Sequence, residues 1–551
     1  MQVRSNIKER LDFFCYMYSR RAKTIVTACV YMCCLQGVSQ LMAMVLKTFF
    51  CNPACDVVHG GLTLKLPDAD LITIWFDYSM ALQDGAAHKY VYCLKGDSGC
   101  RFCCICLNAW ASVSEVLDED GNPLMICVMC KVSEMVPATD ADLLGAIDRL
   151  AHRRATIRNN ATFERWQKAS GLNHQPNGLL LNDDLRSKNI LRPCSQYCHD
   201  PMHTMVANGV MQVVLWCLLV ELGHHMDIWS CLHSYIQLWF SPVHFKASKL
   251  HEMFGKKRER SCKDAKKFKC LASEMLGVYP ILAFFFQSIL QRGDCACKLE
   301  LKAFLMCCDL MDLMMAIPLE IVSPTALQDA VENFLLASKN AGCKFIKKFH
   351  WLLHMPEHLK KWGKIPTCFS LERKHRLIKR FARSVLNTQD YARCLYRETI
   401  NHELAKLKQP DFFKAGVFLV RRHHPSAKTL SFLCEYFNAD VSKHQCFVSN
   451  SAHLQPDGFA ERGDVALLKT AEGDHGPWGA CEVWLHVEID GHAPMSLISL
   501  YNFVRYDQNL YSATWDVKAA PMFVYTSDII SSTTYKKSAG QVITLIPLAH
   551  R

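Results

Sequence analysis

Residues 349–380 read FHWLLHMPEHLKKWGKIPTCFSLERKHRLIKR, and the interpretation of the whole chain starts from this stretch. His350 and His354 are four residues apart, so on a helix both side chains can face one ligand. We expect this helix to end near Pro356. Glu372 opens the next predicted helix, where the helix dipole favours a carboxylate. Taken alone, two ordinary histidines and a dipole-stabilised glutamate are the simpler interpretation.

The chain behind Glu372 is strongly basic. Four cations fall on one face of the predicted helix: Arg376, Lys379, Arg380 and Arg383. A second basic run, KKRERSCKDAKKFK at 256–269, includes Lys256, Lys257, Arg258, Lys266 and Lys267. Both runs are more concentrated than solubility requires, which predicts contact with phosphates. The net charge of +11 is compatible with a polyanionic partner but does not require one.

Composition bounds the class of protein. A chain of 551 residues is long enough for two to four domains. Hydrophobic residues make up 50% and charged residues 21%, which is typical of globular proteins. No apolar signal-peptide segment follows the N-terminal charges, and a secreted disulfide scaffold would be much shorter. The 29 cysteines therefore indicate a reducing compartment with free or metal-bound thiols.

Closely spaced cysteines suggest a zinc site. In KGDSGCRFCCICLN (95–108), Cys103 and Cys106 form a C-x2-C pair, which places two thiolates on one tight turn. Such a pair fits two corners of a tetrahedral zinc site. Cys127 and Cys130 form a second pair that could complete a four-cysteine site.

A further candidate lies in CSQYCHDPMH (194–203). Asp200 and His203 are three residues apart, so their side chains meet on a helical turn and offer an alternative metal site. The simpler interpretation is that Asp200 caps the following helix and His203 packs in its first turn.

The secondary-structure signals change along the chain. Short apolar runs within 62–95 predict strands, and 203–408 has mostly helical spacing. After about residue 410 the pattern becomes β-rich. CEVWLHVEIDG (481–491) alternates apolar and polar residues, and Asp490-Gly491 suits a hairpin turn. These signals predict an α/β chain that ends in a small β-barrel or β-sandwich domain.

One uncharged stretch raises the question of a membrane. TIVTACVYMCCLQGVSQLMAMVL (24–46) is long enough to cross a bilayer and follows several basic residues. Gln36 and Gly37 interrupt it. We therefore expect a buried strand and a core helix here, with a membrane span as the alternative.

Three blocks resemble, in the same order, those of CACTA (En/Spm-type) transposases. Residues 349–380 resemble the family's C-terminal catalytic block: an H-x3-H helix, a glycine, an aromatic residue and a Glu-Arg that opens a basic helix. LQDGAAHKYVYCLKGDSGCRFCCIC (82–106) resembles its second-Asp segment. DPMH (200–203) resembles its Asp-x2-His element. Together the blocks span 82–390, over half of the chain.

The resemblance implies a fold and a chemistry. The fold would be an RNase H-like core with a large helical insertion, and the reaction would be DNA strand cleavage and transfer by two Mg²⁺ or Mn²⁺ ions. Asp84 and Glu372 would be the second and third residues of a DDE triad. The four residues of the structural zinc site would be Cys103, Cys106, His350 and His354.

The chain also departs from the family pattern. Asp12, in RLDFFCYM, is the candidate for the first catalytic aspartate, although no clear block surrounds it. Asp77 competes with Asp84 for the second place. No N-terminal DNA-binding domain is visible, so the core is expected to be incomplete. A decayed or domesticated copy that binds DNA without cutting it is one alternative, and a membrane-attached zinc protein is another.

These interpretations divide the chain into four segments. Residues 1–135 would be a partial RNase H-like core with the zinc knuckle, and 136–200 a helical and irregular connector. Residues 201–408 would hold the helical insertion and the C-terminal core helix, and 409–551 the β-rich domain. The resemblance implies DNA as the partner and a nuclear location. It leaves a homo-oligomer open.

Overall fold

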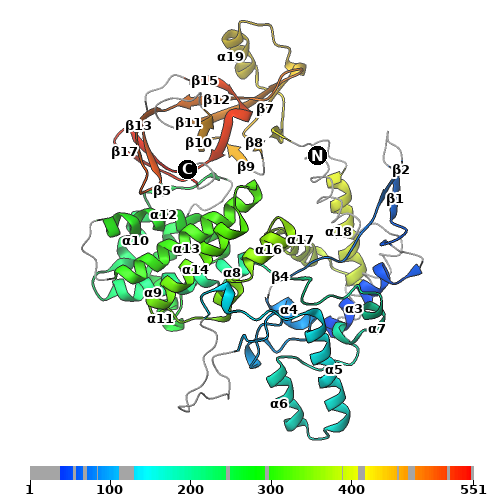
Figure 1. The fold of residues 1–551 in the computed structure, drawn as a ribbon. Coiled ribbons are helices and arrows are strands. Elements are labelled where there is room, and N and C mark those ends of the chain that lie inside the picture. The colour runs from blue at the N-terminus through cyan, green and yellow to red at the C-terminus, as the bar shows by residue number, and fades with distance from the viewer. Residues whose placement is uncertain are drawn as a thin grey trace. The chain divides into compact units, whose positions relative to one another are not determined.

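The computed structural model is mixed α/β, and its elements are labelled in Figure 1. It describes residues 37–53, 57–65, 71–83, 85–110, 129–243, 249–291, 297–387, 389–407, 416–455, 458–469, 478–517 and 521–547. These form two compact units. The first draws on Met1–Thr204, Val331–Leu335 and Lys344–Phe413, and the second on Met205–Ala330, Leu336–Cys343 and Lys414–Arg551. The expected segment 201–408 is thus shared between the units.

The strands of the first unit form two small sheets. β1 (Leu62–Lys65) and β2 (Leu71–Ile74) pair antiparallel, and β3 (Ala81–Gln83) pairs parallel with β4 (Tyr197–His199). Since β3 and β4 run in the same direction, their carboxyl ends share one edge. The part of 62–95 that follows β3 is helix α4 (Gly85–Val91) instead of a strand.

Helix α4 follows a helical spacing that was already present in the sequence. His88, Val91 and Tyr92 are all buried and stand at i, i+3 and i+4, which is one face of a helix. His88 Nε2 lies 2.9 Å from the Ala81 carbonyl oxygen, which ties α4 back to β3. The prediction of a strand was wrong here because short apolar runs do not distinguish the two periods.

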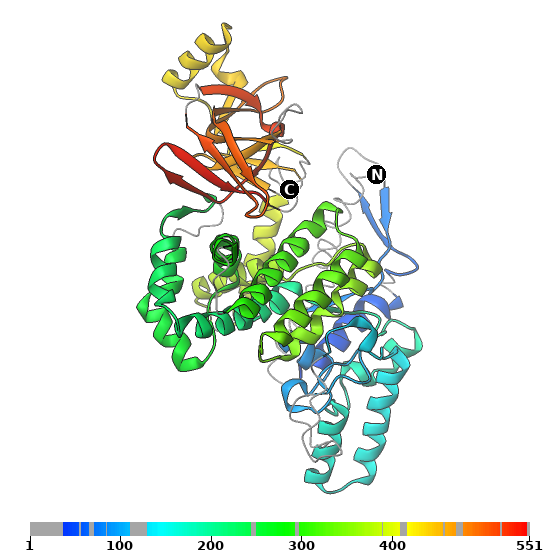
Figure 2. The same ribbon diagram turned by 60° about the vertical axis from the view of Figure 1, so that its left-hand side comes forward.

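The first unit also contains nine further described α-helices. They are α3 (Val38–Phe50), α5 (Asp140–Thr156), α6 (Asn160–Ser170), α7 (Asp183–Ser187), α8 (Pro201–Met205), α15 (Lys347–Leu352), α16 (Met355–Trp362), α17 (Phe369–Ser384) and α18 (Tyr391–Leu407). α5 and α6 lie side by side as a helical hairpin (Figure 2). Thr139 caps α5 in a reciprocal pair of hydrogen bonds with Asp142, as its sequence suggests.

The second unit begins with a helical region. Its helices are α9 (Val210–Gly223), α10 (Ile228–Ile236), α11 (Lys256–Ala265), α12 (Ala272–Gln291), α13 (Lys298–Ala316) and α14 (Pro324–Asn340). α9 packs against α13, and most of its side chains are buried. The mostly helical pattern predicted for 203–408 is confirmed, and 344–407 of this segment belongs to the first unit. That the helices form an insertion in an RNase H-like core stays a prediction.

Among the residues that the structure describes, two helical stretches are long and apolar enough to cross a membrane by length and composition. They are Pro201–Gly223 and Ala272–Ile289, and 61% and 39% of their respective apolar 18-residue windows are buried. The stretch 24–46 is described only from residue 37, where α3 buries Ala43, Val45 and Leu46. The buried face matches the core helix expected there, while residues 24–36 lie outside the described part of the chain.

The strands of the second unit form three antiparallel sheets. Their orders are β15-β12-β11-β10-β16 with β7 on β11, β13-β14-β18-β17-β5, and β6-β8-β9. The elements are β5 (Trp239–Phe240), β6 (Phe418–Val420), α19 (Ala427–Phe437), β7 (Cys446–Ser449), β8 (Ser451–Leu454), β9 (Gly458–Glu461), β10 (Val465–Lys469), β11 (Trp478–Ile489), β12 (Met495–Leu500), β13 (Asn502–Asp507), β14 (Ser512–Asp516), β15 (Pro521–Tyr525), β16 (Ile529–Ser532), β17 (Tyr535–Ser538) and β18 (Gln541–Leu545).

The two larger sheets share one apolar core, as a β-sandwich does. Leu467 and Trp478 from one sheet pack with Trp515 and Val542 from the other. No closed barrel forms among the described strands, so the barrel alternative was wrong. β5 comes from the helical region and extends the five-stranded sheet by pairing with β17.

β11 departs from the alternation expected for 481–491. His486 was expected to face outward with Trp484, but it is fully buried. The register with β12 shifts between Val483 and Leu485, which turns the following side chains to the opposite face. Ser496 Oγ and the Ala460 carbonyl oxygen lie 2.7 and 3.0 Å from the His486 ring nitrogens. Burial lowers the pKa of this imidazole to about 4.

The packing of Gly171, at the end of α6, against the loop that contains Arg101 can be tested by substitution. Gly171 has φ 74°, and a Cβ there would lie 2.2 Å from the Arg101 carbonyl oxygen. Gly363 ends α16 with φ 68° and has open space around it. Gly363→Ala should cost about 1 kcal/mol from backbone strain alone. Gly171→Ala should cost at least about 2 kcal/mol more, because the loop that contains Arg101 must also move.

Urea denaturation of both variants measures this difference in unfolding free energy. Equal losses would show that the loop around Arg101 does not lie against Gly171.

Candidate metal centre and basic surfaces

The loop that carries the cysteine pair is fixed by polar contacts. Arg101 Nε donates a hydrogen bond to the Cys106 carbonyl oxygen at 2.8 Å. Lys95 N donates to the Gly171 carbonyl oxygen at 2.8 Å. Cys103 and Cys106 are both buried and pack with Phe102 and Trp351. The knuckle is therefore held before any ion binds.

The histidine pair lies at a junction between two helices. His350 is in α15, and His354 is the N-terminal capping residue of α16. The expectation of one helix that ends near Pro356 was therefore wrong, since Pro356 lies in the first turn of α16. Proline is tolerated there because the first turn has no intrahelical use for its missing N–H. The backbone N–H of His354 still donates to the Trp351 carbonyl at 3.2 Å, which keeps the two imidazoles on one side.

The four side chains converge. His354 Nε2 lies 3.5 Å from Cys103 Sγ, 3.4 Å from Cys106 Sγ and 3.2 Å from His350 Nε2. All four ligand atoms lie within 4.8 Å of one another. Metal–ligand bonds of about 2.3 Å to sulfur and 2.0–2.1 Å to nitrogen place tetrahedral ligands about 3.3 Å apart for two nitrogens and about 3.6 Å apart for nitrogen and sulfur. The observed distances from His354 Nε2 fit a tetrahedral site that could hold a metal ion.

The environment of this cluster favours a structural ion over a catalytic one. All four residues are buried, and four protein ligands leave no open position for a substrate. The edge of the Phe102 ring contacts His350, with 5.2 Å between centroids. Burial raises the pKa of the Cys103 thiol and lowers the pKa of the His350 imidazole. A bound cation would supply the charge that makes a thiolate stable there.

Of the other candidate ligands and carboxylates, the structure describes some and leaves others outside the described residues. Cys127, Asp12 and Asp84 lie outside the described residues. Cys130 is buried, and its N–H donates to Glu134 at 2.8 Å. Asp77 forms an ion pair with Arg192 at 2.8 Å, so its carboxylate already has a partner.

Glu372 and Arg376 lie in α17, whose backbone the structure describes and whose side chains at these two positions it does not. The helix begins at Phe369, close to the expected start. Lys379, Arg380 and Arg383 are exposed on its later turns. The basic face predicted for this helix is thus accessible at these three positions.

Asp200 and His203 converge with a residue that sequence reasoning missed. Cys368 lies with them in a group whose ligand atoms are within 4.8 Å of one another. Asp200 also accepts hydrogen bonds from the N–H groups of Met202 and His203, so it caps α8 as the simpler interpretation predicted. No sequence spacing could reveal Cys368, because it is far away in the chain.

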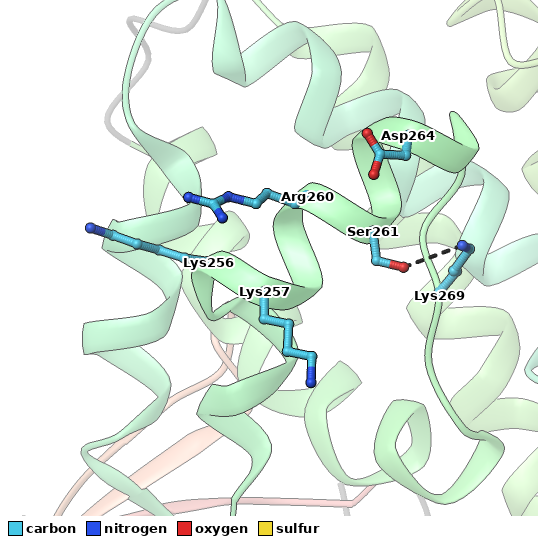
Figure 3. Close-up of a pocket in the computed structure, with 6 residues that line it drawn as sticks. All are labelled: Lys256, Lys257, Arg260, Ser261, Asp264 and Lys269. Atoms are coloured by element: carbon cyan, nitrogen blue, oxygen red, sulfur yellow. Dashed lines mark hydrogen bonds between the residues drawn. The ribbon is translucent and has the colours of Figure 1, made fainter.

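The second basic run forms α11 and the loop after it. A surface pocket of about 570 Å³ lies there, lined by Lys256, Lys257, Arg260, Ser261, Asp264 and Lys269 (Figure 3). Lys256 and Arg260 extend from the same side of the helix, and Asp264 lies near its far end. Ser261 accepts a hydrogen bond from Lys269 at 3.3 Å.

The individual cations of this run are not equivalent. Arg258 donates to the Lys269 carbonyl at 3.0 Å and to Glu274 at 3.1 Å, so its guanidinium is engaged within the fold. Lys266 and Lys267 are exposed just beyond the helix. Sequence reasoning named Arg258 and passed over Arg260, because the chain pattern does not show which cation has a nearby carboxylate.

Comparison with known proteins gives no match to a family model, a curated protein or a solved structure. The argument about function therefore rests on the residues and their geometry. The firmest feature is the buried cluster of Cys103, Cys106, His350 and His354, which could hold a metal ion.

The metal centre gives a second test. His350→Ala combined with His354→Ala should remove the zinc equivalent held by this cluster and lower Tm by roughly 5 °C or more, because two of the four ligands are removed. His358→Ala is the matched control. This buried imidazole accepts a hydrogen bond from His199 N at 3.2 Å and is not one of the four ligands.

The control should lose stability and keep its zinc. Elemental analysis of the purified chains, with thermal unfolding beside it, separates the two effects. If the double variant contains as much zinc as the unchanged chain, the ligands are Cys103, Cys106, Cys127 and Cys130 instead.

Proposed function

We propose that this chain is a transposase-derived, DNA-binding protein of the CACTA-like type, with an RNase H-like core held together by a structural zinc ion. The observation that supports this most is the meeting of two pairs far apart in sequence. Cys106 and His354 are separated by 248 positions, and their side chains lie 3.4 Å apart. The resemblance to CACTA transposases implies the same meeting of the cysteine pair with the histidine pair.

The proposed zinc ion would connect two parts of the first unit. The cysteine loop follows β3 and α4, and the histidine junction precedes α17, which carries Glu372. An ion bound to both would fix the start of α17 relative to β3. Structural zinc contributes directly to folding, since its binding free energy is available only when the ligands converge.

The proposed DNA contacts are the exposed cations. On α17 these are Lys379, Arg380 and Arg383, and on α11 they are Lys256, Lys257 and Arg260. Contacts of this kind neutralise phosphates and release counterions without reading base sequence. We propose a nuclear location for the same reason, because the partner is chromosomal DNA.

Catalysis would require a third carboxylate. Two-metal strand cleavage needs enough oxygen ligands to hold both ions and open positions for water and phosphate. Asp84 and Glu372 would supply two, and Asp12 is the candidate for the third. Without it, we propose a relic that binds DNA and does not cut it.

DNA binding is tested by charge reversal on α17. Changing Lys379, Arg380 and Arg383 to Glu should weaken binding to any duplex and reduce the slope of log affinity against log salt by about three units, one for each lost phosphate contact. Fluorescence anisotropy with a labelled duplex at several salt concentrations measures both quantities.

The control must change the net charge equally. Lys302, Lys339 and Lys428 are exposed lysines outside the proposed surfaces, and reversing all three gives the same change in charge. This control should keep the slope of the unchanged chain. The corresponding reversal of Lys256, Lys257 and Arg260 tests the α11 surface. If the α17 variant and the lysine control behave alike, α17 is not a DNA-binding surface.

Strand cleavage is tested separately. If the triad is complete, the chain should nick supercoiled plasmid with Mg²⁺ or Mn²⁺, and Glu372→Gln should lower the rate at least about 100-fold while DNA binding persists. Asp84→Asn and Asp12→Asn should do the same. Nicking that survives Glu372→Gln would refute its proposed role, and DNA binding without nicking in the unchanged chain would identify the relic.

A further inference from the structure

A second group of ligand-type side chains lies apart from the Cys/His centre. Asp200 follows β4, His203 is in α8, and Cys368 is the N-terminal capping residue of α17. Their ligand atoms lie within 4.8 Å of one another. The group shares no residue with the first cluster, and neither Asp200 nor Cys368 is accessible to solvent.

Asp200 is the centre of this group. One carboxylate oxygen accepts hydrogen bonds from the N–H groups of Met202 at 3.3 Å and Cys368 at 2.9 Å. The other accepts from the His203 N–H at 3.0 Å and contacts His203 Nδ1. Burial would raise the pKa of Asp200, but the hydrogen bonds from His203 and the Cys368 N–H outweigh it and leave the pKa lowered. The carboxylate is therefore a buried negative charge.

The contact between Asp200 and His203 has the geometry of a metal site. A carboxylate oxygen of Asp200 and Nδ1 of His203 face each other, and the Cys368 thiol lies beside both. A cation placed between them would be bound by both atoms after a small separation of the two side chains. The two backbone hydrogen bonds to the other oxygen would continue to orient the carboxylate.

The donor set indicates which cation fits. Carboxylate oxygen, imidazole nitrogen and thiolate sulfur together suit Zn²⁺, whereas Mg²⁺ and Ca²⁺ prefer oxygen ligands alone. Three protein ligands leave a fourth position open. The His203 side chain is 21% exposed, so that position can be reached from solvent on this side.

We propose that Asp200, His203 and Cys368 form a second zinc site, distinct from the Cys/His centre and open at one coordination position. Zn²⁺ would bind the lone pair of Nδ1 on the neutral His203 imidazole, whose single proton is then on Nε2, and binding would release only the thiol proton of Cys368 to solvent. The ion would join the end of β4 to the first turn of α17. This inference does not depend on DNA binding, and it stands if the proposed function fails.

The test counts metal ions in the full chain. Protein purified in the presence of zinc and freed of excess should contain two equivalents by elemental analysis. Cys368→Ser and His203→Gln should each reduce this to one, because each removes a ligand and conserves size. The His350→Ala, His354→Ala double variant should also retain one equivalent, located at the second site.

Cobalt identifies the ligands. Loading the double variant with Co²⁺ should give a thiolate-to-cobalt absorption band, and adding Cys368→Ser should remove it. Cys262→Ser is the control, since Cys262 is buried in α11 and should leave both the count and the band unchanged. Circular dichroism confirms that each variant is folded. One equivalent in the unchanged chain, or two equivalents in both Cys368→Ser and His203→Gln, would overturn the proposal.

Discussion

The first unit depends on what stabilises four polar side chains in its interior, those of Cys103, Cys106, His350 and His354. Two thiols and two imidazoles lie within bonding distance of one point and away from solvent. Among the described atoms, His350 Nδ1 has no hydrogen-bond partner. With an ion, each of the four side chains gains a bond that holds two distant segments together. Whether an ion is bound would therefore influence the position of α17, which contains Glu372.

Asp200 makes a second connection to the same helix. Its carboxylate accepts the N–H of Cys368 at the start of α17 and caps α8 at the end of β4. This hydrogen bond fixes the start of α17 relative to the end of β4. If α17 has the proposed function, such fixation would help to position its acidic residue and its basic face.

Much of this organisation was predictable from sequence, and the limits have physical causes. The meeting of Cys103 and Cys106 with His350 and His354 followed from short spacings and a resemblance in block order. Cys368 could not be found, because nothing local marks a contact across the fold. His486 was expected to face outward because a bulge shifts register without changing composition, and α4 was read as a strand because its apolar run is short.

The short strand β5 has a consequence for how the second unit is made. It belongs to the helical region, yet it completes the sheet that contains β17 and β18. During synthesis, Trp239 and Phe240 leave the ribosome long before Tyr535. β5 therefore stays without its partner strand β17 until the chain is almost complete. Contacts so distant in sequence slow folding and leave intermediates with exposed strand edges. Residues 416–547 expressed alone would also lack the edge strand β5. The five-stranded sheet is therefore complete only when the helical region that contains β5 is present.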